Sequence, residues 1–133
     1  MTTRWLAAEK HSSTMWVGDS SLLVGLGTMP DATRLFSLDT GSGSSYFTDH
    51  YFEEHSSLFS GQPLEMARLA GAGDIHEIPA HAAHQLPLWL GPTRVLCNGQ
   101  HILTQPQGGE VEHYNGVVGQ DLLRQFARSI SVR

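Results

Sequence analysis

The 133-residue chain carries little charge, and its basic side chains are few. Only 16% of the residues are charged; 8 Lys and Arg stand against 13 Asp and Glu, a formal net charge of -5 with histidine neutral. Nucleic-acid binding requires clustered basic side chains that neutralise phosphates, and the sequence has no such cluster. Hydrophobic residues make up 40% of the chain, which excludes an intrinsically disordered protein.

Cysteine is nearly absent, since Cys97 is the single one. A lone cysteine excludes both a disulfide framework and a multi-cysteine zinc site, and we expect Cys97 to be a small core residue. No run is apolar and long enough for a signal peptide or a membrane span. The sequence therefore does not determine the cellular compartment. We expect a soluble domain that could belong to a longer protein.

Glycine and proline, in contrast, are frequent, with 14 and 6 copies. They separate short segments of β-favouring residues, so the sequence predicts one mostly β domain with one or two short helices. The segments expected to form strands are 15–29 (broken near 18–20), 33–38, 46–47, 64–69, 75–79, 86–90, 94–96, 101–105 and 129–132.

Two helices and one tight turn complete this prediction. A helix is expected from 49 to about 56, with the hydroxyl of Thr48 as its N-cap, and a second from 121 to about 128. Asn98-Gly99 is typical of a two-residue β-hairpin, so we expect the strands on either side of it to pair.

The triplet Asp39-Thr40-Gly41 follows an apolar strand and opens a loop rich in serine and glycine. Val117-Val118-Gly119 comes later, with Gly119 placed 119 − 39 = 80 residues after Asp39, and leads into a helix beginning Asp-Leu-Leu. With the glycine-rich tip at 70–74, this pattern resembles the retropepsin-type (retroviral-like) aspartic peptidases, especially their single-domain cellular and bacterial relatives. The resemblance covers about 22–132, most of the chain.

This resemblance implies a single-lobe acid protease fold, a closed β-barrel or sandwich over 16–133 that works as a homodimer on polypeptide substrates, without metal or other cofactor. Residues 1–15 have no counterpart and are expected to be a leader or interface segment, which could be a pro-segment, an interface strand or a linker. The implied site residues are catalytic Asp39, the loop Thr40, Gly41 and Ser42, the flap Ala70, Gly71, Ala72, Gly73 and Asp74, and the supporting Val117, Val118 and Gly119.

The chemistry explains why one triplet is not enough. Two carboxylates about 3 Å apart would repel by roughly 5 kcal/mol at an effective dielectric of about 20, so they share one proton. The ionised group activates a water molecule and the protonated one polarises the peptide carbonyl. Gly41 would let the backbone approach its neighbour closely, and we expect Ser42 to orient the carboxylate. The second Asp39 must come from a second copy.

Other interpretations of the same residues stay open. Asp39-Thr40-Gly41 could simply end a strand, and the tip at 70–74 could be an ordinary hairpin. The alternative function is a retropepsin-like dimerisation or peptide-binding module that does not cut. Four residues with metal-ligating side chains lie close together in the sequence: His76, Glu77, His81 and His84. Their spacing matches no known zinc pattern, so we expect them to be solvated loop residues.

Overall fold

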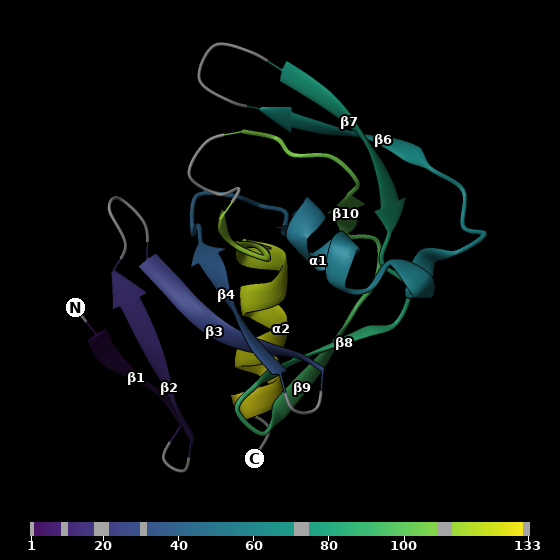
Figure 1. Ribbon diagram of the computed structural model, residues 1–133. Coiled ribbons are helices and arrows are strands. Elements are labelled where there is room, and N and C mark those ends of the chain that lie inside the picture. Colours follow the sequence, from purple (N-terminus) through teal and green to yellow (C-terminus); the bar gives the residue numbers. More distant parts are fainter. Residues whose placement is uncertain are drawn as a thin grey trace.

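The computed structural model describes the backbone of residues 2–8, 11–17, 22–29, 32–70, 75–108 and 113–131. Its strands are β1 (Thr2–Ala8), β2 (His11–Val17), β3 (Leu22–Met29), β4 (Ala32–Leu38), β5 (Tyr46–Phe47), β6 (Glu65–Ala70), β7 (Ile75–Ala82), β8 (Leu86–Leu90), β9 (Thr93–Cys97), β10 (His101–Leu103) and β11 (Gly116–Val118). Its helices are α1 (Asp49–Glu54), the 3₁₀ helix η1 (Ser56–Phe59) and α2 (Gln120–Ser131). The prediction of a mostly β chain with short helices is confirmed (Figure 1).

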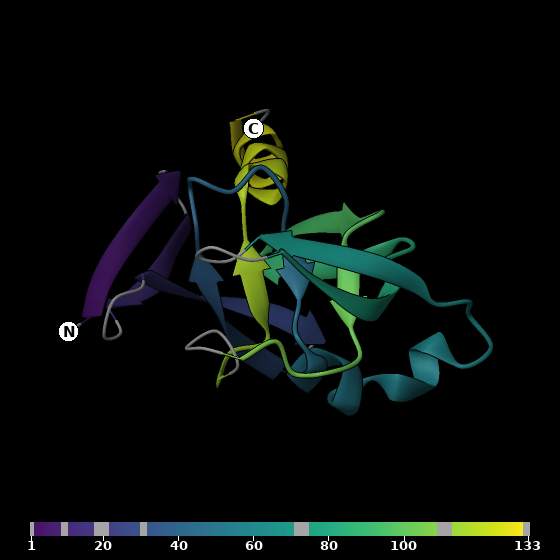
Figure 2. The ribbon, with the colours of Figure 1, turned by 90° about the horizontal axis from the view of Figure 1, so that it is seen from above.

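The strands join into one mixed sheet with the order β1-β2-β3-β4-β11-β5-β10-β7-β6, and β8 and β9 branch from β3. The expected closed barrel or sandwich is not what the described residues form, because this path runs from one edge strand, β1, to another, β6. The hairpin of β1 and β2 lies on one side of the fold, and the hairpin of β6 and β7 lies on the other (Figure 2). The two edges therefore do not meet, and the sheet stays open.

Two local predictions were wrong. Residues 129–131 belong to α2 and not to a last strand. Position 130 continues the i, i+4 spacing of Leu122 and Phe126, and this helical periodicity outweighs the short alternating pattern. The chain bends at Asn98-Gly99, with Gly99 at φ 89°, but β9 pairs with β8 whereas β10 pairs with β5 and β7. The bend thus connects strands with different neighbours and makes no hairpin.

α1 begins at Asp49 with Thr48 at the N-cap position, as predicted, but the expected capping bond is absent. The hydroxyl of Thr48 makes no capping bond to the helix and instead donates to the carbonyl oxygen of Tyr114. The backbone N–H of Thr48 donates to the carbonyl oxygen of Asn115 at 2.9 Å. Both bonds hold α1 against the segment that leads into β11.

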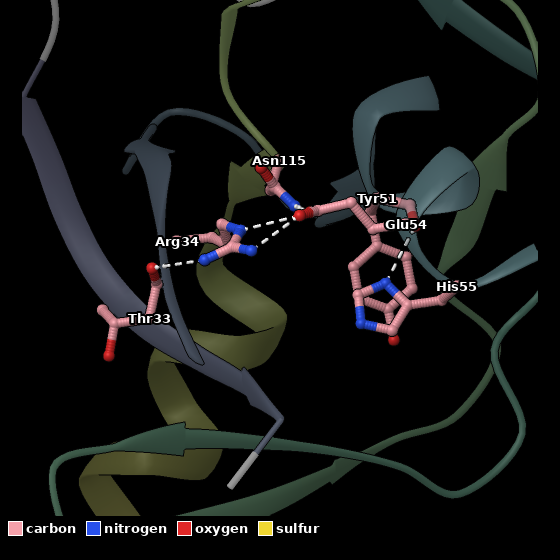
Figure 3. Close-up of polar contacts among 6 residues, drawn as sticks. All are labelled: Thr33, Arg34, Tyr51, Glu54, His55 and Asn115. Atoms are coloured by element: carbon pink, nitrogen blue, oxygen red, sulfur yellow. Dashed lines mark hydrogen bonds and ion pairs between the residues drawn. The ribbon is translucent and has the colours of Figure 1, made fainter. Parts of the chain in front are cut away.

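An ion-paired carboxylate reinforces the same junction. Glu54 of α1 accepts from Arg34 of β4, with Nε at 2.9 Å and the second guanidinium nitrogen at 2.7 Å, and from Asn115 Nδ2 at 2.7 Å (Figure 3). Arg34 also donates to the carbonyl oxygen of Thr33 at 3.2 Å. One side chain of α1 therefore ties β4 to the residue before β11.

The main hydrophobic core lies between the sheet and the two helices, and its largest fully buried side chains include Phe36, Phe47 and Leu122. Cys97 is fully buried in this cluster, which confirms that it is a core residue. A second, smaller cluster lies under the hairpin of β6 and β7 and consists of Ala67, Ile78, Ala80 and Leu103, with Tyr46 and Leu69 packed against it.

His81 contradicts the expectation of a solvated loop. It lies in β7, is 7% exposed, and its ring stacks on Phe52 and Phe59 at centroid distances of 5.6 and 5.3 Å. His76 and Glu77 also lie in β7, although both are exposed. Within the described part of the chain, no three His, Cys, Asp or Glu side chains gather as metal ligands would.

The N-terminal segment continues the sheet. β1 pairs with β2, and β2 pairs with β3 through Met15, Trp16 and Val17. The division expected at residue 16 therefore falls inside β2. The role of residues 1–15 as a leader or interface segment stays a prediction.

Candidate active site

Asp39 stands directly after β4, where a parallel neighbour holds it. β11 pairs with β4 in the register Val117 to Ser37 and Val118 to Leu38. The N–H of Asp39 then donates to the carbonyl oxygen of Val118 at 2.9 Å, so the pairing extends one residue beyond the strand. Figure 2 shows β11 between β4 and β5, which places the Val117-Val118 segment beside the strand that ends at Asp39.

Gly119 lies where no side chain fits. A Cβ atom at this position would lie 2.7 Å from the carbonyl oxygen of Ser42 and 2.8 Å from that of Ser44. Both contacts are to backbone, which moves much less easily than a flexible side chain. The glycine therefore allows the loop after Asp39 to pack directly on the chain between β11 and α2.

Hydrogen bonds from the start of α2 fix the same loop. The backbone N–H of Gln120 donates to the carbonyl oxygen of Ser42 at 2.8 Å, and its side-chain Nε2 donates to that of Thr40 at 2.7 Å. The buried hydroxyl of Ser45 accepts from the N–H of Gly119 at 2.7 Å and donates to the carboxylate of Asp121. The whole loop after Asp39 is thus anchored to residues 119–121.

The Asp39 carboxylate itself is exposed and accepts the N–H of Gly41 at 3.0 Å. The expectation that Ser42 orients this carboxylate was wrong, because the Ser42 hydroxyl donates to the carbonyl oxygen of Ser44 at 2.8 Å. A Cβ on Gly41 would lie 3.4 Å from Asp39 Oδ1, an ordinary contact, so the single chain does not require glycine there. Thr40 and Gly41 are exposed beside Asp39.

A pocket of about 360 Å³ opens at Asp39. Its walls come from the end of β4, the following loop, β5, β6, the segment after β10 and β11. The side chains around it are those of Ser37, Asp39, Ser42, Ser44, Tyr46, Arg68, Leu69, Gln107 and Val117. Its volume is near the lower end of the ~300–1,000 Å³ typical of ligand pockets.

The hairpin of β6 and β7 contributes Arg68 and Leu69 to this pocket. Its strands pair without interruption from Glu65 opposite Ala80 to Ala70 opposite Ile75. A contact between Glu65 Oε1 and His101 Nε2 at 2.8 Å joins its base to β10. Ala70 ends β6, whereas Gly71, Ala72, Gly73 and Asp74, the predicted flap tip, lie outside the described residues. The flap role stays a prediction.

The sequence analysis missed six of the residues that line the pocket, and two of these, Tyr46 and Gln107, are hydrogen-bonded to each other. The hydroxyl of Tyr46 accepts from Gln107 Nε2 at 3.0 Å. Burial raises the pKa of Tyr46, the hydrogen bond from Gln107 lowers it, and the charge of Asp39 raises it further. In the sequence, Tyr46 is typical of an apolar strand residue, so nothing indicates that it lines a pocket. Gln107 lies in a polar stretch, and no local pattern distinguishes it from its neighbours.

Comparison with models of known families and with curated proteins finds no match. No helix in the described ranges has the length and apolar character needed to cross a membrane.

Proposed function

We propose that the chain is a retropepsin-like aspartic endopeptidase, active as a homodimer, that hydrolyses peptide bonds with water held between two Asp39 carboxylates. The observation that carries this proposal is the position of Asp39: it is exposed, follows β4, and is held by β11 beside a pocket that β6 helps to form. A rigid loop presenting a carboxylate into a pocket is the arrangement that acid-base hydrolysis needs.

The need for a second copy follows from the charges in the pocket. Among its described lining residues, Asp39 is the only carboxylate. In aspartic peptidases the general acid and the general base are two carboxyl groups in different protonation states, held so close that they share one proton. A symmetric dimer supplies the second Asp39 on its two-fold axis.

In the proposed reaction the ionised Asp39 takes a proton from the water molecule, whose oxygen attacks the carbonyl carbon of the scissile bond. The protonated Asp39 of the other copy donates to the carbonyl oxygen. Collapse of the tetrahedral intermediate then breaks the C–N bond, and a carboxyl proton moves to the departing nitrogen. The bonds from Gln120 to the loop carbonyls keep the carboxylate in place throughout.

The test is cleavage of a peptide library between about pH 3 and pH 7, a range that includes the pH at which such a carboxyl pair loses its shared proton. The wild type should cleave and sediment as a dimer. Asp39→Asn should lose cleavage at least about a thousandfold while remaining a folded dimer. Glu53→Gln, which removes an exposed carboxylate of α1 outside the pocket, is the matched control and should cleave normally.

Two results would overturn the proposal. Cleavage by Asp39→Asn at the wild-type rate would exclude the mechanism. A dimer that binds peptides and transition-state mimics but cuts none across this pH range would favour the alternative, a non-catalytic peptide-binding module.

A further inference from the structure

Of the nine residues around the pocket beside Asp39, five carry neutral polar side chains, and Asp39 and Arg68 are charged. Three serines, one tyrosine and one glutamine surround it, and aliphatic carbon comes mainly from Leu69 and Val117; the polar residues are Ser37, Ser42, Ser44, Tyr46 and Gln107. An aliphatic ligand group would remove water from these hydroxyl and amide groups and return no hydrogen bond. The lining therefore favours a ligand group that forms hydrogen bonds itself.

Tyr46 provides the best defined donor. Its ring packs against the cluster under β6 and β7, which fixes the direction of the side chain. Its hydroxyl oxygen accepts from Gln107 Nε2 at 3.0 Å, and no described residue accepts its proton. Burial raises the pKa of Tyr46, so the hydroxyl stays protonated and able to donate at neutral and acidic pH.

Among the described residues, Gln107 keeps one polar atom of the pocket wall without a hydrogen-bond partner. Its Oε1 is buried and meets no donor among the described residues, although its Nε2 is paired with Tyr46. Tyr46 and Gln107 are 61 residues apart in sequence and come from different walls of the pocket. Their contact therefore links the two walls by polar groups at a place where an apolar pocket would use aliphatic side chains.

We propose that this pocket selects a neutral substrate side chain ending in a carboxamide, Asn or Gln, whose oxygen accepts the hydroxyl proton of Tyr46. The inference rests on the proposed function, because the substrate is a peptide held beside Asp39. Leucine has the shape of asparagine but would offer no acceptor for the proton of the Tyr46 hydroxyl. A site built on hydrogen bonds rejects such an analogue more strongly than an apolar site rejects a polar one.

The test compares peptides that carry Asn or Leu at each position on either side of the scissile bond. At one position the wild type should cleave the Asn peptide with a kcat/KM higher by about tenfold or more. Tyr46→Phe, which removes only the hydroxyl, should reduce this ratio to near one. Tyr114→Phe removes a hydroxyl outside the pocket and should leave the ratio unchanged. Urea unfolding shows whether each variant is folded.

The outcomes separate this inference from the proposed function. Cleavage with equal or higher kcat/KM for the Leu peptides at every position would overturn the carboxamide preference and leave the peptidase intact. If no peptide is cleaved, the carboxamide preference is tested by measuring the binding of the same peptides made with an uncleavable scissile bond. Tighter binding of an Asn peptide that Tyr46→Phe abolishes would support the pocket assignment, and equal binding of Asn and Leu peptides would overturn it.

Discussion

The backbone N–H of Asp39 donates to the carbonyl oxygen of Val118 at 2.9 Å. This bond joins the residue that we propose as catalytic to a three-residue strand formed near the other end of the chain. Because β11 pairs with β4 in parallel and Gly119 follows it at once, the direction of Asp39 is set by backbone contacts. The candidate site is therefore only as rigid as the junction between β11 and α2.

The first prediction concerns this junction. Gly119→Ala places a Cβ less than 3 Å from the carbonyl oxygens of Ser42 and Ser44, so the loop must shift. We expect the free energy of unfolding to fall by about 2–3 kcal/mol. Peptidase activity should fall by a larger fraction than the stability does. Gly43→Ala in the same loop meets nothing within 4 Å and is the matched control. Equal urea unfolding curves for the two variants would contradict this account.

The second prediction concerns pH and Glu54. The hydrogen bond from Arg34 lowers the pKa of Glu54; burial opposes this shift, and Asn115 and the charges of Arg34 and His55 add to it. A lowered carboxyl pKa stabilises the fold above the unfolded-state value of 4.5, and the contribution disappears as the pH falls through the folded-state value. Glu54→Gln should therefore reduce stability modestly at pH 7 and have progressively less effect below about pH 4.

Thermal unfolding measured across this pH range checks the second prediction. Glu53→Gln removes the same charge from the same helix without breaking the contact with Arg34, and it serves as the control. If the difference in stability between Glu54→Gln and the wild type grew as the pH fell, the direction of the Glu54 pKa shift would be wrong.

The third prediction concerns Cys97. Burial first, and the charge of Asp121 second, raise the pKa of this thiol to about 12. At pH 8 the thiolate fraction is then about one in 10⁴, and the thiol is also shielded from solvent. A disulfide reagent should leave the native protein unlabelled and label one thiol per chain in urea. Rapid stoichiometric labelling of the native protein would count against the buried position.

The strand positions could be predicted largely from the turns between them. Gly91-Pro92 separates the predicted segments 86–90 and 94–96, and the structure has β8 and β9 there, with Gly91 at φ 57°. The pairing of strands was harder to predict, because it depends on distant residues. Nothing local in the sequence shows that β11 inserts between β4 and β5, and Asn98-Gly99 has the turn chemistry of a hairpin without its pairing.

In the candidate site, too, local features could be predicted from the sequence, whereas contacts between distant residues could not. The sequence places Asp39 at a strand end, since an apolar run stops there, and the structure agrees. The expected role of Ser42 failed because a nearby backbone carbonyl, that of Ser44, takes its hydroxyl proton. Tyr46 and Gln107 could not be paired from the sequence because folding alone brings their distant segments together.

The central claim, that two copies of Asp39 form one site, is tested most directly by mixing subunits. Wild type and Asp39→Asn are co-expressed in equal amounts, and the pooled protein is assayed against the same amount of pure wild type. Random pairing leaves two carboxylates in about one quarter of the dimers, so activity should fall to about one quarter. A fall to only about one half would show that each chain works alone and would contradict the shared site.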